Sequence, residues 1–109
     1  MWNKHINTKK GVSYYVLKAS LKMAAERCEA IYKRHDYKFT ITSTNDGIHK
    51  KGSLHYIGLA FDCRTRHLTK TILEIIIGDI KRELSLIDEN FQVIKQKDHI
   101  HIEYDRRRK

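Results

Sequence analysis

The sequence predicts an α+β domain in which two main helices pack on a small antiparallel sheet of about four strands. Two long segments repeat apolar residues at helical spacing, and several short segments alternate apolar and polar residues. The two alternating segments nearest the C-terminus follow each other directly, which favours a hairpin and hence an antiparallel sheet. A chain of 109 residues is expected to form one domain over residues 1–109, with irregular tails at 1–12 and 105–109.

The first helix is predicted over residues 13–34, where apolar side chains recur at the spacing of one helical face. That face is formed by Leu17, Leu21, Ala24, Cys28 and Ile31. A half-buried strand is predicted next, because Tyr37, Phe39 and Ile41 alternate with polar residues. Residues 43–53 read STNDGIHKKGS, a polar stretch without periodicity, and are expected to form a loop.

A second strand is predicted over residues 57–63, followed by a second helix over residues 68–84. The buried stripe of this helix is formed by Leu73, Ile76, Ile80 and Leu84. Thr71 and Glu74 have the T-x-x-E spacing of a capping box. Gly78 inside the helix is about 1 kcal/mol less favourable than alanine, so we expect a close packing neighbour there.

The two remaining strands are predicted over residues 91–96 and 99–104. Side chains two residues apart lie on the same side of a strand. The last strand therefore has an apolar face, formed by Ile100, Ile102 and Tyr104, and a polar face, formed by His99, His101 and Glu103.

The chain is basic, since 22 Lys and Arg against 13 Asp and Glu give a net charge of +9. A basic surface favours anionic partners such as nucleic acid, anionic lipid or acidic cell-wall polymer. No apolar run approaches the ~20 residues of a membrane helix, and residues 1–11 lack the apolar stretch of a signal peptide. We therefore expect a protein that is made in the cytoplasm and does not enter a membrane. Cys28 and Cys63 are expected to be reduced, buried thiols.

Polar residues on strand patterns are the candidates for chemistry. They are His55, Asp62, His99, His101 and Glu103. Imidazole and carboxylate groups are common ligands of Zn²⁺, and three protein ligands leave a fourth position for water. The same residues are equally compatible with surface or hydrogen-bonded histidines and with a turn-forming aspartate. Spacing alone leaves both interpretations open.

Two motifs carry a family resemblance. Residues 53–62 read SLHYIGLAFD and match S-x-H-x-x-G-x-A-x-D, and residues 98–103 read DHIHIE and match a [DE]-x-x-H pattern that includes H-x-H. In this order and spacing they resemble the zinc D-Ala-D-Ala carboxypeptidase family, which includes bacteriophage L-alanyl-D-glutamate endopeptidases (endolysins). That family belongs to a wider group with lysostaphin-type peptidases and the hedgehog signalling domain. The resemblance implies the hedgehog/DD-peptidase-like fold.

The resemblance also implies roles for individual residues. His55, Asp62 and His101 would bind Zn²⁺. Asp98 would be the general base, which requires it to lie in the turn before the last strand rather than in the strand. His99 would support catalysis by stabilising charge on the tetrahedral intermediate. Gly58 is expected to allow an unusual backbone angle or a close approach near the metal. Glu103 is expected to support an imidazole N–H, with a surface ion pair as the alternative.

The sequence matches the family's substrate-contacting residues only in part. Ser53 corresponds to the family's substrate-contacting hydroxyl, with a turn-stabilising serine as the alternative. Many relatives have an arginine after the Thr-Ser pair that polarises the scissile carbonyl, whereas residues 42–47 here read TSTNDG. Lys50 or Arg64, or else Lys51 or His49, could supply the positive group.

The expected function is that of a zinc metallopeptidase, a hydrolase that cuts a peptide bond in peptidoglycan stem peptides. The bond would be L-Ala–D-Glu, as for an endopeptidase, or D-Ala–D-Ala, as for a carboxypeptidase. The enzyme would be a monomeric, phage-type lysin that acts on the anionic cell wall after release or as a virion component. The first alternative is a non-catalytic zinc-binding module of the same fold. The second, suggested by charge alone, is a nucleic-acid-binding protein, although no motif of that class is present and nucleic acid is not an expected partner.

Overall fold

The computed structural model describes residues 6–45 and 54–106, and every structural statement below concerns these residues. Their elements follow in the order α1 (Ala19–Arg34), β1 (Ile41–Ser43), the 3₁₀ helix η1 (Leu54–Ile57), β2 (Ala60–Arg64), α2 (Lys70–Ile87), β3 (Phe91–Lys95) and β4 (His99–Tyr104). The predicted α+β class, with two helices and a four-stranded antiparallel sheet, is confirmed. Among the described helices, none combines the length and apolar composition that a membrane crossing requires.

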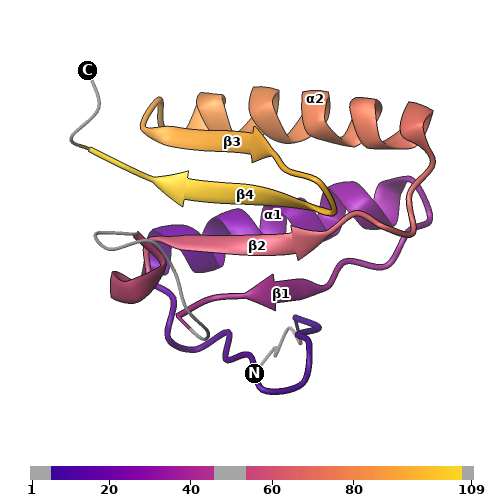
Figure 1. The fold of residues 1–109 in the computed structure, drawn as a ribbon. Coiled ribbons are helices and arrows are strands. Elements are labelled where there is room, and N and C mark those ends of the chain that lie inside the picture. Colours follow the sequence, from indigo (N-terminus) through magenta and orange to yellow (C-terminus); the bar gives the residue numbers. More distant parts are fainter. Residues whose placement is uncertain (1–5, 46–53, 107–109) are drawn as a thin grey trace, which may run out of the picture.

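The sheet has the order β1-β2-β4-β3, and each neighbouring pair is antiparallel. Both long helices lie on one side of the sheet, behind the strands in Figure 1, with α1 across the middle and α2 along the β3 edge. The side that faces the viewer carries neither helix. The fold therefore has two layers, with one sheet face turned toward the helices and the other left uncovered by them.

The register of the central strands follows from which side chains are buried. Phe61 of β2 and Ile100 and Ile102 of β4 are fully buried in the core with the helices. Burying one such side chain stabilises a fold by about 1.5–3 kcal/mol. A slip of one residue would exchange these side chains with Asp62 and His101, which pair across β2 and β4 on the other face. Apolar burial thus keeps the polar side chains on the uncovered face.

Helix α1 buries the predicted apolar face, since all five of its members are buried. Its start was predicted too early, because it begins at Ala19 rather than at residue 13. The reason is a change of hydrogen-bond partner: the Lys18 N–H donates to the Gly58 carbonyl at 2.9 Å, and the Leu17 N–H closes a turn onto Tyr14 at 3.2 Å. Leu17 is buried although it precedes the helix.

Two predicted strands are shorter than expected. The first is limited to Ile41–Ser43, because Phe39 and Thr40 are both buried and do not alternate. The second begins at Ala60, because η1 and a turn at Gly58 come before it. The predicted loop over 43–53 begins after Ser43 of β1, and its residues 46–53 lie outside the described part of the chain.

The tails match the prediction in part. Residues 6–12 form neither a helix nor a strand, but an isolated bridge joins Thr8 to Ile41. At the other end, Asp105 and Arg106 follow β4 without regular structure, and residues 107–109 lie outside the described part.

Three members of the stripe predicted for helix α2, Ile76, Ile80 and Leu84, are buried, and the fourth, Leu73, is partly buried against the core. The predicted capping box is wrong. The helix begins at Lys70, two residues earlier than a box on Thr71 requires. Thr69 is therefore the N-cap, and its hydroxyl accepts a hydrogen bond from the Ile72 N–H at 3.2 Å. Glu74 instead accepts a hydrogen bond from Lys95 of β3 at 3.0 Å.

Gly78 does not have the packing neighbour expected from the sequence. It is exposed, and a Cβ built on it would meet no atom within 4 Å. Gly78→Ala should therefore raise the free energy of unfolding by about 1 kcal/mol, because alanine loses less backbone entropy in a helix. Urea unfolding measures this change, with Lys81→Ala at another exposed position of α2 as a control expected to differ by only a few tenths. An unchanged or lower midpoint for Gly78→Ala would contradict the prediction.

Both cysteines are free and buried, as predicted. Cys63 lies on the helix-facing side of β2, where its sulfur is 3.6 Å from the Tyr32 hydroxyl. Burial raises the pKa of the Cys63 thiol to about 12. The thiol is therefore protonated at neutral pH and lies on the opposite side of β2 from Asp62.

Candidate functional site

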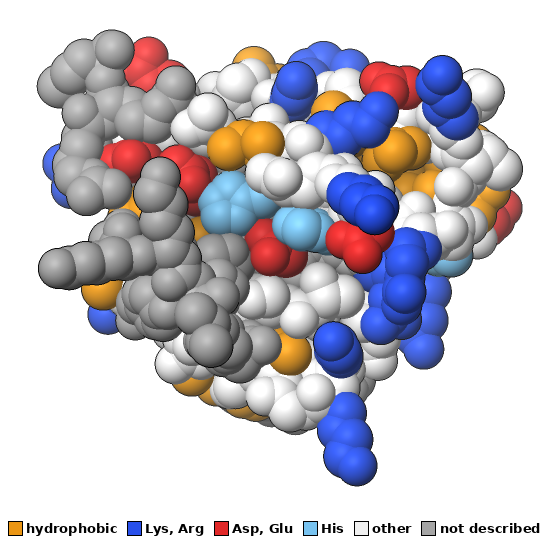
Figure 2. Space-filling view, in the orientation of Figure 1, with side chains coloured by type: hydrophobic (Ala, Val, Ile, Leu, Met, Phe, Trp, Pro, Cys, Tyr) orange, Lys and Arg blue, Asp and Glu red, His pale blue; other side chains and the backbone are white. Residues whose placement is uncertain are grey.

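Five acidic and imidazole side chains form a row on the uncovered face of the sheet. Asp98 Oδ1 is 2.9 Å from His99 Nδ1, and His99 Nε2 is 3.6 Å from Asp62 Oδ2. Asp62 Oδ1 is 2.9 Å from His101 Nδ1, and His101 Nε2 is 2.8 Å from Glu103 Oε1. Figure 2 shows the histidines and carboxylates gathered near the centre of this face. We call these five residues the polar row.

The pairing of β2 with β4 brings the row together. Asp62 lies directly opposite His101, and Arg64 lies opposite His99. The predicted polar face of the last strand is confirmed, because Ile100 and Ile102 are buried in the core while the alternate residues line the row. Strand β2 therefore contributes a carboxylate between the two imidazoles of β4.

Asp98 occupies the bend before β4, as its predicted role requires. Its carbonyl accepts a hydrogen bond from the Thr65 N–H at 3.1 Å, which ties the bend to the segment after β2. Its side chain is 57% exposed. The hydrogen bond from His99, aided by the nearby charge of Arg66, lowers the pKa of the Asp98 carboxyl, so the group is ionised at neutral pH.

His101 is one of the more enclosed residues of the row, with 16% of its side chain exposed. Burial lowers the pKa of the imidazole, but its hydrogen bonds to Asp62 and Glu103 outweigh that effect, and the net pKa is raised. Each ring nitrogen faces one carboxylate oxygen. The two carboxylates therefore fix the ring orientation from both sides.

Two of the three predicted zinc ligands are close enough to share one ion. Atoms that bind the same tetrahedral Zn²⁺ at about 2.0–2.1 Å lie about 3.4 Å apart, and Asp62 Oδ1 and His101 Nδ1 are 2.9 Å apart. Glu103 faces the other ring nitrogen, in the place of a carboxylate that orients a metal-binding histidine. Within residues 6–45 and 54–106, no group of three His, Cys, Asp or Glu side chains suited to a metal is found. The side chain of the third predicted ligand, His55, lies outside the described part.

The backbone that carries His55 is described, and it corrects the expectation of a strand there. His55 belongs to η1, which contacts β2 and packs Leu54 into a buried position. Gly58 follows with φ +77°, and a Cβ on it would lie 2.5 Å from the Val16 carbonyl oxygen. The unusual backbone angle expected of this glycine is confirmed, and its close approach is to the segment before α1. The turn holds η1 against the segment before α1.

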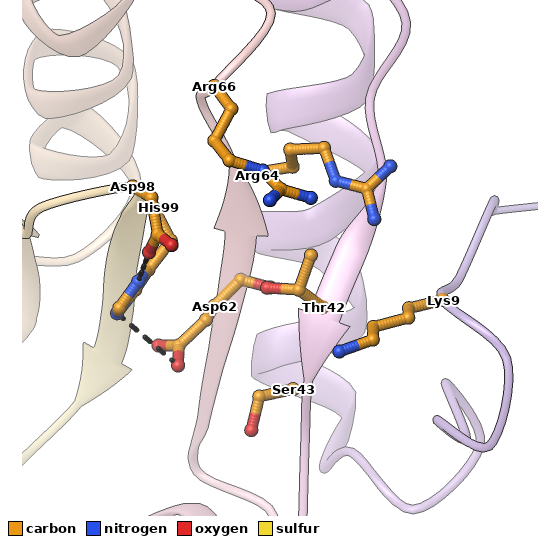
Figure 3. Close-up of a pocket in the computed structure, with 8 residues that line it drawn as sticks. All are labelled: Lys9, Thr42, Ser43, Asp62, Arg64, Arg66, Asp98 and His99. Carbon is orange, nitrogen blue, oxygen red and sulfur yellow. Dashed lines mark hydrogen bonds and ion pairs between the residues drawn. The ribbon is translucent and has the colours of Figure 1, made fainter.

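The row borders a cleft of about 280 Å³ (Figure 3). Its lining comes from the N-terminal segment, β1, β2, the turn after β2 and the start of β4. The lining residues are Lys9, Thr42, Ser43, Asp62, Arg64, Arg66, Asp98 and His99. In Figure 3 the Asp62 carboxylate points toward His99. The Lys9 and Arg64 side chains lie farther from the Asp98–His99 pair than the Arg66 side chain does.

The structure therefore brings five of the eight predicted site residues to one place. Asp62, Asp98, His99 and Arg64 line the cleft, and His101 adjoins it through Asp62. Predicted substrate contacts Ser53 and Lys50, like the His55 side chain, lie outside the described residues.

Two further cleft residues, Lys9 and Arg66, were not anticipated from the sequence. Arg66 follows β2 closely enough to be suspected, whereas nothing in the pattern around Lys9 indicated that the N-terminal segment returns to the sheet. No protein-family model, curated protein or solved structure matches the chain.

Proposed function

We propose that the chain is a zinc-dependent peptidase that hydrolyses a peptide bond in peptidoglycan stem peptides. The observation that carries the proposal is the meeting of Asp62 with His101, and of Asp98 with His99, beside one cleft on the uncovered sheet face. Asp62 is far in the sequence from Asp98, His99 and His101, and these four are the described residues to which the motif resemblance assigns metal binding and catalytic roles. Their convergence supports that assignment.

The donor set fits Zn²⁺ in chemistry and in the spacing of its described members. His55, Asp62 and His101 would hold the ion, which when bound acts as a Lewis acid and lowers the pKa of bound water to about 7. Glu103 accepts a hydrogen bond from the second ring N–H of His101 and so fixes the orientation of that ring.

The remaining steps belong to side chains of the cleft. The Asp98 carboxylate, ionised at neutral pH, accepts a proton from the attacking water while the water oxygen bonds to the scissile carbonyl carbon. Asp98 then returns that proton to the amine nitrogen as the C–N bond breaks, so the products are a carboxylate and an amine. His99 donates its Nδ1–H to Asp98, so its Nε2, on the Asp62 side, carries a proton only in the imidazolium form. In that form the Nε2–H can stabilise the developing oxyanion.

The substrate class and setting follow from the resemblance and the charge. A net charge of +9 favours approach to an anionic cell wall. We propose a phage-type lysin that acts as a monomer on the wall after release or as a virion component.

The test is digestion of purified muropeptides, followed by mass spectrometry of the products. Hydrolysis at L-Ala–D-Glu or D-Ala–D-Ala is expected, with complete loss in a zinc chelator and recovery on addition of stoichiometric Zn²⁺. Turnover that survives removal of all bound metal would overturn the zinc mechanism. One bound zinc per chain with no hydrolysis of any stem peptide would favour the non-catalytic zinc-binding module.

A further inference from the structure

Three cationic side chains line the cleft together. Arg64 projects from β2, Arg66 from the turn after it, and Lys9 from the N-terminal segment. Lys9 is held there by its backbone, because its N–H donates to the Ile41 carbonyl at 2.8 Å and the Ile41 N–H donates to Asn7 at 3.0 Å. Figure 3 shows the Lys9 side chain reaching toward β1 and the two guanidinium groups grouped at one end of the cleft. We call these three residues the cationic wall.

The Arg66 charge acts on the Asp98 carboxyl, whose pKa it helps to lower, but in the described part of the chain the acidic groups of the cleft form no ion pair with the other two members of this wall. Asp98 bonds His99, and Asp62 bonds His101. Within the described ranges, neither Lys9 nor Arg64 forms an ion pair with a carboxylate, and the buried Arg64 Nε has no hydrogen-bond partner. Arg64 is only partly buried and lines the cleft, so its guanidinium group is suited to a ligand that brings oxygen atoms.

We propose that the cationic wall binds a carboxylate of the substrate, next to the bond that is cut. This inference rests on the proposed function and specifies its substrate class as an acidic peptide. A guanidinium presents parallel N–H donors that match the two oxygens of a carboxylate, so Arg64 is the main contact, and Lys9 and Arg66 add positive charge. The carboxylate lies near the cleaved bond because Asp98 and His99 line the same small cleft.

Both candidate bonds satisfy this requirement. In L-Ala–D-Glu, the glutamyl residue has a carboxyl group that is not part of the cleaved bond, and in D-Ala–D-Ala the terminal residue ends in one. The cleft volume of about 280 Å³ is near the lower limit of small-ligand pockets, about 300 Å³. It accommodates one acidic residue rather than a long segment of peptide.

The experiment uses two synthetic stem peptides that differ only by a carboxylate or a carboxamide on the residue after the cleaved bond. Calorimetry measures binding of each peptide, and product release measures kcat/KM. Wild type should prefer the acid peptide by about 10–100-fold, the size of a charged hydrogen bond. Arg64→Gln should bring the acid-to-amide ratio close to one, while Arg64→Lys should keep part of it. Lys9→Gln should reduce the ratio mainly at low salt, because an exposed charge is screened.

Lys33→Gln is the matched control, since Lys33 is an exposed cation on α1, behind the sheet, and its loss should leave the ratio unchanged. If Arg64→Gln does not fold, the double variant Lys9→Gln/Arg66→Gln tests the wall through two exposed residues. Equal binding and turnover of both peptides by wild type would overturn the carboxylate site but leave the peptidase intact. Preferential binding of the acid peptide without hydrolysis would support the site and contradict the peptidase. If the protein neither prefers the acid peptide nor hydrolyses either peptide, the carboxylate site and the peptidase are both overturned.

Discussion

Replacing Asp98 by asparagine should lower kcat for stem-peptide hydrolysis by about 10²–10⁴-fold, the usual contribution of general acid–base catalysis. Asparagine keeps the shape of the side chain but cannot accept the proton of the attacking water. The fold should be unaffected, because the Asp98 side chain is 57% exposed and the hydrogen bond from Thr65 is accepted by the Asp98 backbone carbonyl. Product release measured by liquid chromatography gives kcat, and zinc content is determined on the same sample.

Two comparisons define what the Asp98→Asn result means. Asp36→Asn is the matched control, because it makes the same chemical change at an exposed residue where the positive φ of 66° suits asparagine. Asp62→Asn should lose zinc as well as activity, whereas Asp98→Asn should keep its zinc. Near-normal turnover in Asp98→Asn together with a large loss in His99→Gln would contradict the proposal, since the imidazole would then be the base.

The sequence predicted β4 correctly because the strand has two chemically different faces. Ile100 and Ile102 are required in the core, so the alternation fixes both the limits of the strand and the direction of His99 and His101. The same alternation holds for β2, where Asp62 lies on the opposite face from Phe61. The part of the polar row contributed by β2 and β4 was therefore predictable once the two strands were expected to share a sheet.

The start of α1 was not predictable in this way. Side-chain periodicity reports burial, and Leu17 is buried at the helical spacing although the backbone there is not helical. The helix starts only after Lys18, because the Lys18 N–H donates to the carbonyl of Gly58, a residue far from it in the sequence. No local pattern contains that contact.

The place of Lys9 in the cleft and the contact between Asp79 and His35 were also not predicted, because both depend on residues far apart in the sequence. Lys9 is placed at the cleft by two backbone hydrogen bonds, from the Lys9 N–H to the Ile41 carbonyl and from the Ile41 N–H to the Asn7 carbonyl. Such bonds impose no side-chain pattern. Asp79 of α2 likewise accepts hydrogen bonds from His35, which follows α1, at 3.0 Å, and from Arg82 at 2.6 Å. Only the second of these pairs has a spacing along one helix that a sequence can reveal.

Gly58→Ala should lower the free energy of unfolding by about 2–5 kcal/mol, a large part of the 5–15 kcal/mol typical of a domain. Two costs combine. A side chain at φ +77° is strained, and the new Cβ would lie 2.5 Å from the Val16 carbonyl oxygen, which belongs to the backbone and cannot rotate away. Urea unfolding of the metal-free protein measures the change.

Gly11→Ala provides the matched control for the strain alone. Gly11 also has a positive φ, +86°, but a Cβ there would meet nothing within 4 Å. Its substitution should cost about 1–2 kcal/mol, so the difference between the two variants isolates the contact with Val16. If Gly58→Ala destabilises no more than Gly11→Ala, then Gly58 does not lie as close to the Val16 carbonyl as the structure shows.

The same substitution connects stability to the site. Relieving the clash requires Gly58 to move away from Val16, which weakens the hydrogen bond from Lys18 to the Gly58 carbonyl. Because η1 carries His55 immediately before this turn, a folded Gly58→Ala protein should also bind Zn²⁺ more weakly, as measured by competition with a chromophoric chelator. Gly11→Ala should bind zinc like wild type, because Gly11 is not part of the turn that holds η1. Equal zinc affinity in Gly58→Ala and wild type would mean that the position of η1 does not control the metal site, and His55 would lose its assigned role as the third ligand.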